Sequence, residues 1–174
     1  QAERTEELAD GVRQNLAEVE KLATLLASDP NAAMPQHFAS RPSAEAVRLL
    51  KRAAQSGVAA FRVEWLQTGE AAVQIDGALA FQLPPALASL LEVLAMDAGR
   101  ADGILVGWKT TALLAGLMQK KLGRPFQPHT IHTQISRLRE ALAATGGVNP
   151  YLVQTRPGWG ARFALRKAPG QTAM

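Results

Sequence analysis

Residues 129–139 read HTIHTQISRLR and are the most informative segment for predicting the fold. Apolar residues recur through and just beyond it at spacings of four, three and four, which places them on one face of an α-helix; they are Ile131, Ile135, Leu138 and Leu142. The other side chains are mostly polar or basic, and Glu140 is the one acidic residue. The pattern predicts a helix over 129–144, ended by Gly146-Gly147. Such a helix fits the major groove of duplex DNA, where hydrogen-bonding side chains read base edges.

Helical and strand patterns alternate around this segment. Period-two alternation predicts three strands before it, and Asp76-Gly77 predicts a two-residue hairpin turn because both positions need positive φ; the strands are 61–66, 71–75 and 79–83. A helix is expected from Pro84-Pro85 to about 96 and another over 109–122, with a short apolar segment at 104–106 between them. A terminal hairpin is expected from 151–155 and 161–165.

The N-terminal third shows only helical patterns. A helix is predicted over 4–27, a proline-containing linker over 32–42 and a second helix over 43–55. We therefore expect three regions: a helical extension at 1–57, a domain at 58–167 and a disordered tail at 168–174. Residues 4–55 are expected to form a homodimer or to dock a sensor partner, although the apolar stripe of the first helix also suits intramolecular packing.

Charge is divided unevenly along the chain. Residues 1–99 contain 8 Lys or Arg against 13 Asp or Glu, whereas residues 100–174 contain 11 against 2. The formal charges of the two parts are therefore −5 and +9, within a total of +4. So basic a C-terminal part is expected to attract a polyanion such as DNA, although a solvated basic face without a partner fits the charge equally well.

Composition excludes several classes of function. The chain has no cysteine, which excludes disulfides and cysteine nucleophiles and is compatible with a reducing cytoplasm. No apolar run approaches the roughly 18 residues that span a bilayer, so we expect a cytoplasmic protein with no membrane partner. His129 and His132 lie one helical turn apart with no third ligand nearby in the sequence, so no metal or other cofactor is expected. No carboxylate pair or nucleophile has an activating partner, so the chain is not expected to be an enzyme.

Three segments, in order, resemble the winged-helix DNA-binding domain of OmpR/PhoB-type response regulators. They are residues 81–91 (FQLPPALASLL), 133–142 (TQISRLREAL) and 152–160 (LVQTRPGWG). The second is similar to the family's recognition-helix pattern V-x-I-x-R-L-R-x-K-L, and the third to its wing pattern I-x-T-V-R-G-x-G-Y. With the strands at 61–83 matching the family's N-terminal sheet, the resemblance covers about 105 of the 174 residues. It implies an α+β winged helix-turn-helix fold and a bacterial transcription regulator that binds double-stranded DNA sequence-specifically.

The resemblance also implies roles for single residues. Six residues match the DNA-facing part of the recognition helix: Thr130, His132, Thr133, Gln134, Arg137 and Arg139. Trp108 and Lys109 match positions that commonly touch phosphates, and the loop 123–128 matches a segment that can contact RNA polymerase. His129 is also expected to face the DNA, because of its residue type and its position at the start of the predicted helix, and not because of the resemblance.

The terminal hairpin departs from the family pattern. Pro157 stands where the family has an arginine before the first wing glycine, and Ala161 stands where it has a tyrosine after the second. These departures weaken the expectation that the wing enters a minor groove. Arg156 and Arg162 remain to contact the DNA backbone or that groove.

The N-terminal region does not match the phosphorylated receiver of these regulators. Residues 1–57 are too short and predict two helices without a strand, so phosphorylation control is not expected within this chain. A second function stays open, because many winged-helix folds bind proteins without specific DNA binding. A positive face over 129–144 would favour DNA, whereas an exposed apolar patch there would favour a protein partner.

Overall fold

The computed structural model describes residues 42–144 and 148–168, which form an α+β fold with small antiparallel sheets and four α-helices in that part of the chain. The elements are α2 (Ala44–Ala54), β1 (Phe61–Trp65), β2 (Ala71–Ile75), β3 (Phe81–Leu83), α3 (Pro85–Ala95), β4 (Arg100–Asp102), β5 (Leu105–Trp108), α4 (Thr111–Leu122), the 3-10 turn η2 (Pro128–Thr130), α5 (Ile131–Ala144), the 3-10 turn η3 (Pro150–Leu152), β6 (Val153–Arg156) and β7 (Gly160–Phe163). The predicted helix at 4–27, its linker and the tail from 169 lie outside the described residues. No helix in the described ranges is long and apolar enough to cross a membrane.

The first sheet contains β1, β2 and β3 in sequence order, all antiparallel. The residues Asp76 and Gly77 have φ values of 49° and 72°, so the positive-φ turn predicted after β2 is confirmed. The connection to β3 is nevertheless longer than the predicted two residues, because β3 begins at Phe81 and Leu79 is 95 % exposed. The predicted strand at 79–83 is therefore two residues too long at its start.

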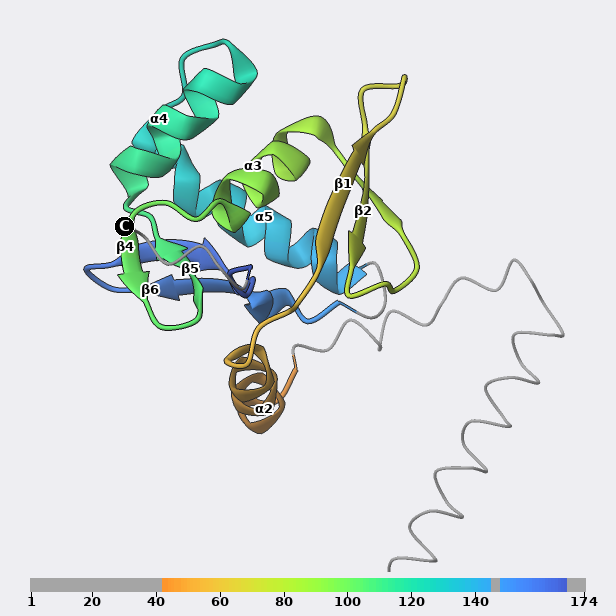
Figure 1. Cartoon of the computed structure of the whole chain (residues 1–174), viewed down its shortest axis with the longest axis vertical. Coiled ribbons are helices and arrows are strands. Elements are labelled where there is room, and N and C mark those ends of the chain that lie inside the picture. The colour runs from red at the N-terminus through yellow and green to blue at the C-terminus, as the bar shows by residue number, and fades with distance from the viewer. Residues whose placement is uncertain (1–41, 145–147, 169–174) are drawn as a thin grey trace, which may run out of the picture. The chain divides into compact units, whose positions relative to one another are not determined.

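The helices α3, α4 and α5 pack around a common apolar core (Figure 1). The predicted inner face of α5 is confirmed, since Ile131, Ile135, Leu138 and Leu142 are each at most 3 % exposed. Burying a side chain of this size contributes roughly 1.5–3 kcal/mol. This face fixes which side of α5 points away from the core, and so which residues remain available to a partner.

The helix α4 has a defined signal at each end. The hydroxyl of Thr110 accepts a hydrogen bond from the N–H of Leu113 at 3.2 Å, which satisfies one free donor of the first turn. Gly123 ends the helix with φ 65°, and its N–H donates to the carbonyl of Gln119 at 2.9 Å. The helix therefore begins at Thr111, two residues later than predicted, and Lys109 lies before it.

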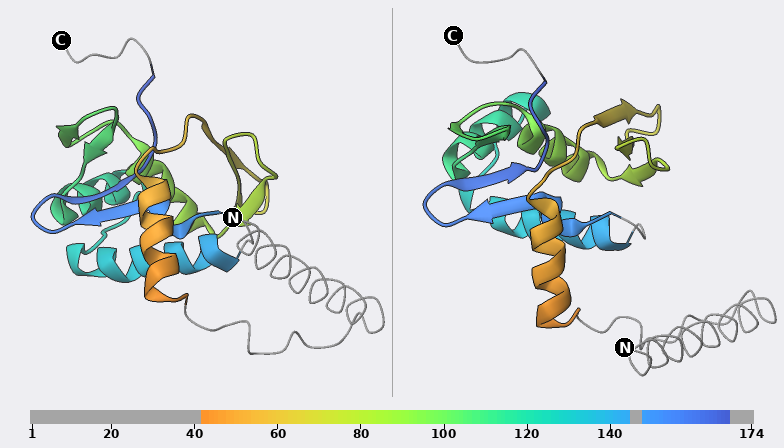
Figure 2. Two further views of the ribbon diagram at one scale, coloured as in Figure 1. Left: turned by 90° about the horizontal axis from the view of Figure 1, so that it is seen from below. Right: turned by 60° about the horizontal axis from the view of Figure 1, so that its bottom comes forward.

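The β4–β5 and β6–β7 hairpins lie side by side (Figure 2). The N–H of Lys109 donates to the carbonyl of Ala161, and the N–H of Ala161 donates to the carbonyl of Lys109, each at 2.9 Å. The segment predicted as a short apolar stretch at 104–106 is thus part of a hairpin that supports β7. This pairing holds the start of α4 next to the β6–β7 hairpin.

The helix α2 belongs to the same compact unit, which begins at Pro42. Two side chains from the C-terminal part donate to its last carbonyls: Asn149 Nδ2 to Leu50 at 2.7 Å, and Gln154 Nε2 to Ala54 at 3.2 Å. The boundary expected at 57/58 therefore does not separate two compact units. The cause is that side chains far along the sequence donate hydrogen bonds to carbonyls in the last two turns of this helix.

Candidate nucleic-acid interface

A groove of about 610 Å³ runs between α5, the start of α4 and the β6–β7 hairpin. Its polar lining comes from hydroxyl, imidazole and guanidinium groups, namely Thr110, Thr111, His132, Ser136, Arg139, Thr155 and Arg156. Hydroxyl, guanidinium and backbone N–H groups are the usual partners of phosphate oxygens. The groove thus has the chemistry to hold a stretch of nucleic-acid backbone.

The outward face of α5 borders this groove. His132, Thr133, Ser136 and Arg137 are exposed, and so is His129 in the turn before the helix. Arg137 makes no ion pair with any other described residue. Gln134 and Thr130 are half-buried, and the Thr130 hydroxyl donates to the carbonyl of Gln127 at 2.7 Å. Of the predicted recognition residues, His129, His132, Thr133 and Arg137 are therefore the most accessible.

The tip of the β6–β7 hairpin gathers positive charge around one indole ring. The guanidinium carbon of Arg100 lies 3.3 Å from the centre of the Trp159 ring, and that of Arg156 lies 4.0 Å from it. Trp108 meets Trp159 edge-on at 6.4 Å. Arg100 and Arg156 are both exposed, so the tip presents two cations that the aromatic ring holds in place.

Arg139 links α5 to the hairpin. Its Nε and Nη2 donate to the carbonyl of Val153 at 3.0 and 2.7 Å, and Nη2 also donates to the hydroxyl of Thr155 at 3.2 Å. Burial lowers the pKa of this guanidinium, against a smaller raising effect of Tyr151. Arg139 therefore positions the hairpin beside the helix, which differs from the direct DNA contact expected for it.

Lys109 does not lie where a phosphate contact requires. Its side chain is 0 % exposed, and Nζ donates to the carbonyls of Leu94 and Gly107 at 3.0 Å each. Desolvation by burial lowers its pKa to about 8, although Asp97 opposes the shift. The phosphate contact predicted for the Lys109 side chain therefore does not fit the structure, because the side chain is buried and Nζ donates to two backbone carbonyls.

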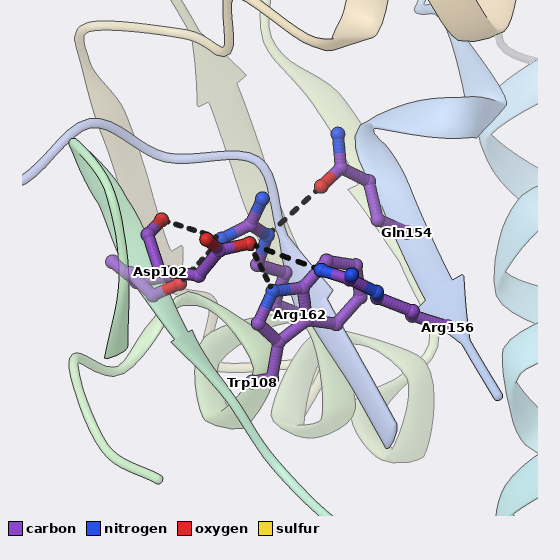
Figure 3. Close-up of polar contacts among 6 residues, drawn as sticks. Asp102, Trp108, Gln154, Arg156 and Arg162 are labelled. Atoms are coloured by element: carbon purple, nitrogen blue, oxygen red, sulfur yellow. Dashed lines mark hydrogen bonds and ion pairs between the residues drawn. The ribbon is translucent and has the colours of Figure 1, made fainter. Parts of the chain in front are cut away.

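Trp108 and Arg162 are also enclosed, at 6 % and 7 % exposed. Figure 3 shows both converging on Asp102. The indole Nε1 of Trp108 donates to Asp102 Oδ2 at 3.1 Å, and Arg162 donates to Gln154 Oε1 at 2.8 Å and to the carbonyls of Asp102 and Val106 at 3.3 Å. Their side chains hold the two hairpins together, so the expected DNA contacts by these residues do not fit the structure.

The sequence did not indicate three contributors to this surface. Arg100 reaches the hairpin tip only because β4 pairs with β5, and Thr110 and Thr111 face the groove because α4 starts there. A sequence can indicate that a threonine caps a helix, but the residues that surround that threonine in space depend on tertiary packing. The loop 123–128 is largely exposed, with Phe126 packed against the core, and it lies at the far end of α4 from Thr110.

Comparison with known proteins gave no match: no family model, no curated protein and no solved structure is similar to this chain.

Proposed function

We propose that the chain is a winged-helix, sequence-specific double-stranded DNA-binding protein that regulates transcription. In this proposal α5 enters the major groove and the β6–β7 hairpin acts as the wing. The observation that carries it is the polar outer face of α5, where Arg137 and Thr133 are exposed and His132 lines a groove that Arg156 lines from the hairpin. Guanidinium and hydroxyl groups can bond base edges and phosphates from this face.

The order of elements supports the proposal. A small sheet, three packed helices and a terminal hairpin follow one another as the resemblance to OmpR/PhoB-type domains implies. The positive charge lies in the same part of the chain, with 11 Lys or Arg against 2 Asp or Glu in residues 100–174. Strong excess charge supplies the sequence-independent part of DNA affinity.

The positions of the exposed apolar side chains argue against the competing function, a protein-interaction module. The exposed large hydrophobic side chains of the described residues are Leu49, Trp65, Leu79, Met96, Ile104 and Leu113. None of these lies on α5 or on the β6–β7 hairpin. Apolar side chains such as Leu114, Ile135 and Trp159 line part of the groove. The exposed residues of α5 are nevertheless mainly polar or basic, which suits a nucleic acid better than a protein partner.

The remaining partners follow from the same proposal. The loop 123–128 would offer its exposed residues, including Arg124, to RNA polymerase. Residues 4–55 would provide a dimer contact or a docking site for a sensor. A role on the bacterial chromosome places the protein in the cytoplasm.

Fluorescence anisotropy with a random duplex tests the proposal. If about six phosphates are neutralised, the logarithm of the affinity falls with the logarithm of the salt concentration at a slope near −5. Changing Arg137 to Ala should weaken binding, whereas Arg52→Ala removes one exposed charge from α2 and should change it less. The proposal fails if low-micromolar protein shows no salt-sensitive binding.

A further inference from the structure

A hollow of about 440 Å³ lies between α2, the β6–β7 hairpin and β4. Four basic side chains line it from three separate segments of the chain: Lys51, Arg139, Arg156 and Arg162. Among the described residues that line it, Asp102 is the only acid. The hollow therefore collects more positive than negative charge in a small volume.

The hydrogen bonds inside the hollow leave most of this charge without a counterion. Arg139 bonds a carbonyl and a hydroxyl, and Arg162 bonds carbonyls and an amide oxygen. Only Arg156 reaches the Asp102 carboxylate, at 3.4 Å, and that oxygen also accepts from an indole N–H. Burial lowers the pKa of both Arg139 and Arg162. At Arg162 the charge of Asp102 opposes this shift, and the charge of Arg156 adds a smaller lowering effect on the pKa. A bound anion would relieve this unfavourable grouping of like charges.

Two of the cations lie near the ring of Tyr151. Lys51 Nζ lies 5.3 Å from the centre of the Tyr151 ring, and the guanidinium carbon of Arg139 lies 5.8 Å from it. Lys51 has no ion pair among the described residues and is exposed, so its ammonium is free to move toward a ligand. Amide groups of Gln55 and Gln154 add neutral hydrogen-bonding atoms at the rim.

We propose that this hollow binds a free small molecule that carries two adjacent phosphate groups, as in a nucleoside diphosphate. Each phosphodiester of duplex DNA brings one negative charge, whereas a terminal diphosphate brings two or three charges to four converging cations. The volume lies within the range of roughly 300–1,000 Å³ that small-ligand pockets occupy. The hollow shares Arg139, Thr155 and Arg156 with the groove proposed for nucleic acid, whereas Lys51, Gln55 and Arg162 line the hollow alone. Binding in the hollow can be measured without DNA, and Lys51 distinguishes the two sites.

Calorimetric titration of the full chain with inorganic pyrophosphate tests the proposal. We expect one saturable site with a dissociation constant below about 1 mM, as several charge-assisted contacts imply. Lys51→Gln should weaken binding about tenfold, since one charged contact is lost. Arg52→Gln is the matched control, because it removes the same charge from the next residue outside the hollow and should change binding less than about threefold.

The outcomes separate this site from a general basic surface and from a DNA phosphate site. The proposal is wrong if pyrophosphate binding does not saturate at about 10 mM, or if the two variants lose equal affinity for pyrophosphate. Either result would be explained by diffuse attraction to a basic surface. Duplex binding is measured on the same variants. Should Lys51→Gln reduce DNA affinity as strongly as pyrophosphate affinity, the hollow holds a DNA phosphate and the free-ligand proposal is wrong. If the protein binds pyrophosphate as expected but does not bind DNA, the proposed anion site is supported and only the proposed DNA-binding function is wrong.

Discussion

Lys109 is a buried ammonium group at the point where the two C-terminal hairpins meet. It is 0 % exposed and bonds two backbone carbonyls, and desolvation lowers its pKa from 10.5 to about 8. Between these two values the unfolded chain binds more protons than the folded one, so stability rises with pH. Below pH 8 both states are protonated and this contribution is at its lowest.

Urea unfolding of the wild type and of Lys109→Met checks this dependence. Other groups titrate alike in both proteins, so the difference between their free energies of unfolding reports Lys109. Between pH 7.5 and pH 10 the free energy of unfolding of the wild type should rise by about 2 kcal/mol relative to that of Lys109→Met. A constant difference, or one that moves the other way, would show that Lys109 is hydrated in the folded state.

Gly160 marks a close approach between β7 and the residue before α4. Its φ is 103°, and a Cβ built there would overlap the carbonyl oxygen of Lys109. Gly160→Ala should therefore lower the free energy of unfolding by more than about 3 kcal/mol, because neither backbone can move aside without breaking the Lys109–Ala161 pairing. Gly158→Ala is the control, since Gly158 also has positive φ, 74°, but open space around it. Similar losses for both variants in thermal unfolding would mean that backbone strain, and not overlap, is responsible.

At the residue scale, the sequence predicted apolar positions well and basic ones poorly. The spacing of Ile131, Ile135, Leu138 and Leu142 determined the buried face of α5 because helical geometry links spacing directly to direction. The charges of Lys109 and Arg162 suggested exposure, since such side chains are rarely buried. Their burial depends on carbonyls of Leu94, Gly107, Asp102 and Val106, which only the tertiary fold brings together.

At the scale of elements, Arg139 couples α5 to β6. It makes three hydrogen bonds to Val153 and Thr155, while Arg137, two residues earlier, is exposed. Arg139→Met should lower the free energy of unfolding by about 1–3 kcal/mol, because the loss leaves a buried carbonyl without its charged donor. Arg137→Met should change it by less than about 0.5 kcal/mol. Chemical denaturation of the two variants measures both values, and equal effects would contradict the coupling.

Element boundaries were predictable where a local pattern is strong. The strand β2 matches its predicted range of 71–75, and α5 covers Ile131–Ala144 of the predicted range 129–144, because alternation and helical periodicity are properties of the local sequence. The first two predicted positions belong to the turn η2, and the predicted stop at Gly146-Gly147 lies outside the described residues. The strand β4 was not predicted. Its three residues, Arg100 to Asp102, are too few and too polar to show alternation, and their conformation depends on pairing with β5.

At the scale of the whole described unit, α2 is part of the C-terminal fold. Asn149 and Gln154 bond its last carbonyls, and Ala54 is 1 % exposed. A fragment of residues 42–174 should therefore be more stable than a fragment of residues 58–174 by about 2 kcal/mol, from two hydrogen bonds and lost apolar contact. Thermal and urea unfolding of the two fragments test this. Equal stability would restore the boundary that the sequence suggested at 57/58.

Base readout by the outward face of α5 can be measured by selection from a random duplex library, followed by sequencing of the bound fragments. We expect the wild type to enrich a defined motif. Arg137→Ala or Gln134→Ala should lose roughly tenfold to a hundredfold in affinity for that motif, while non-specific affinity falls much less. A bound pool that is indistinguishable from the starting library, or equal losses on specific and random DNA, would contradict base readout by this helix.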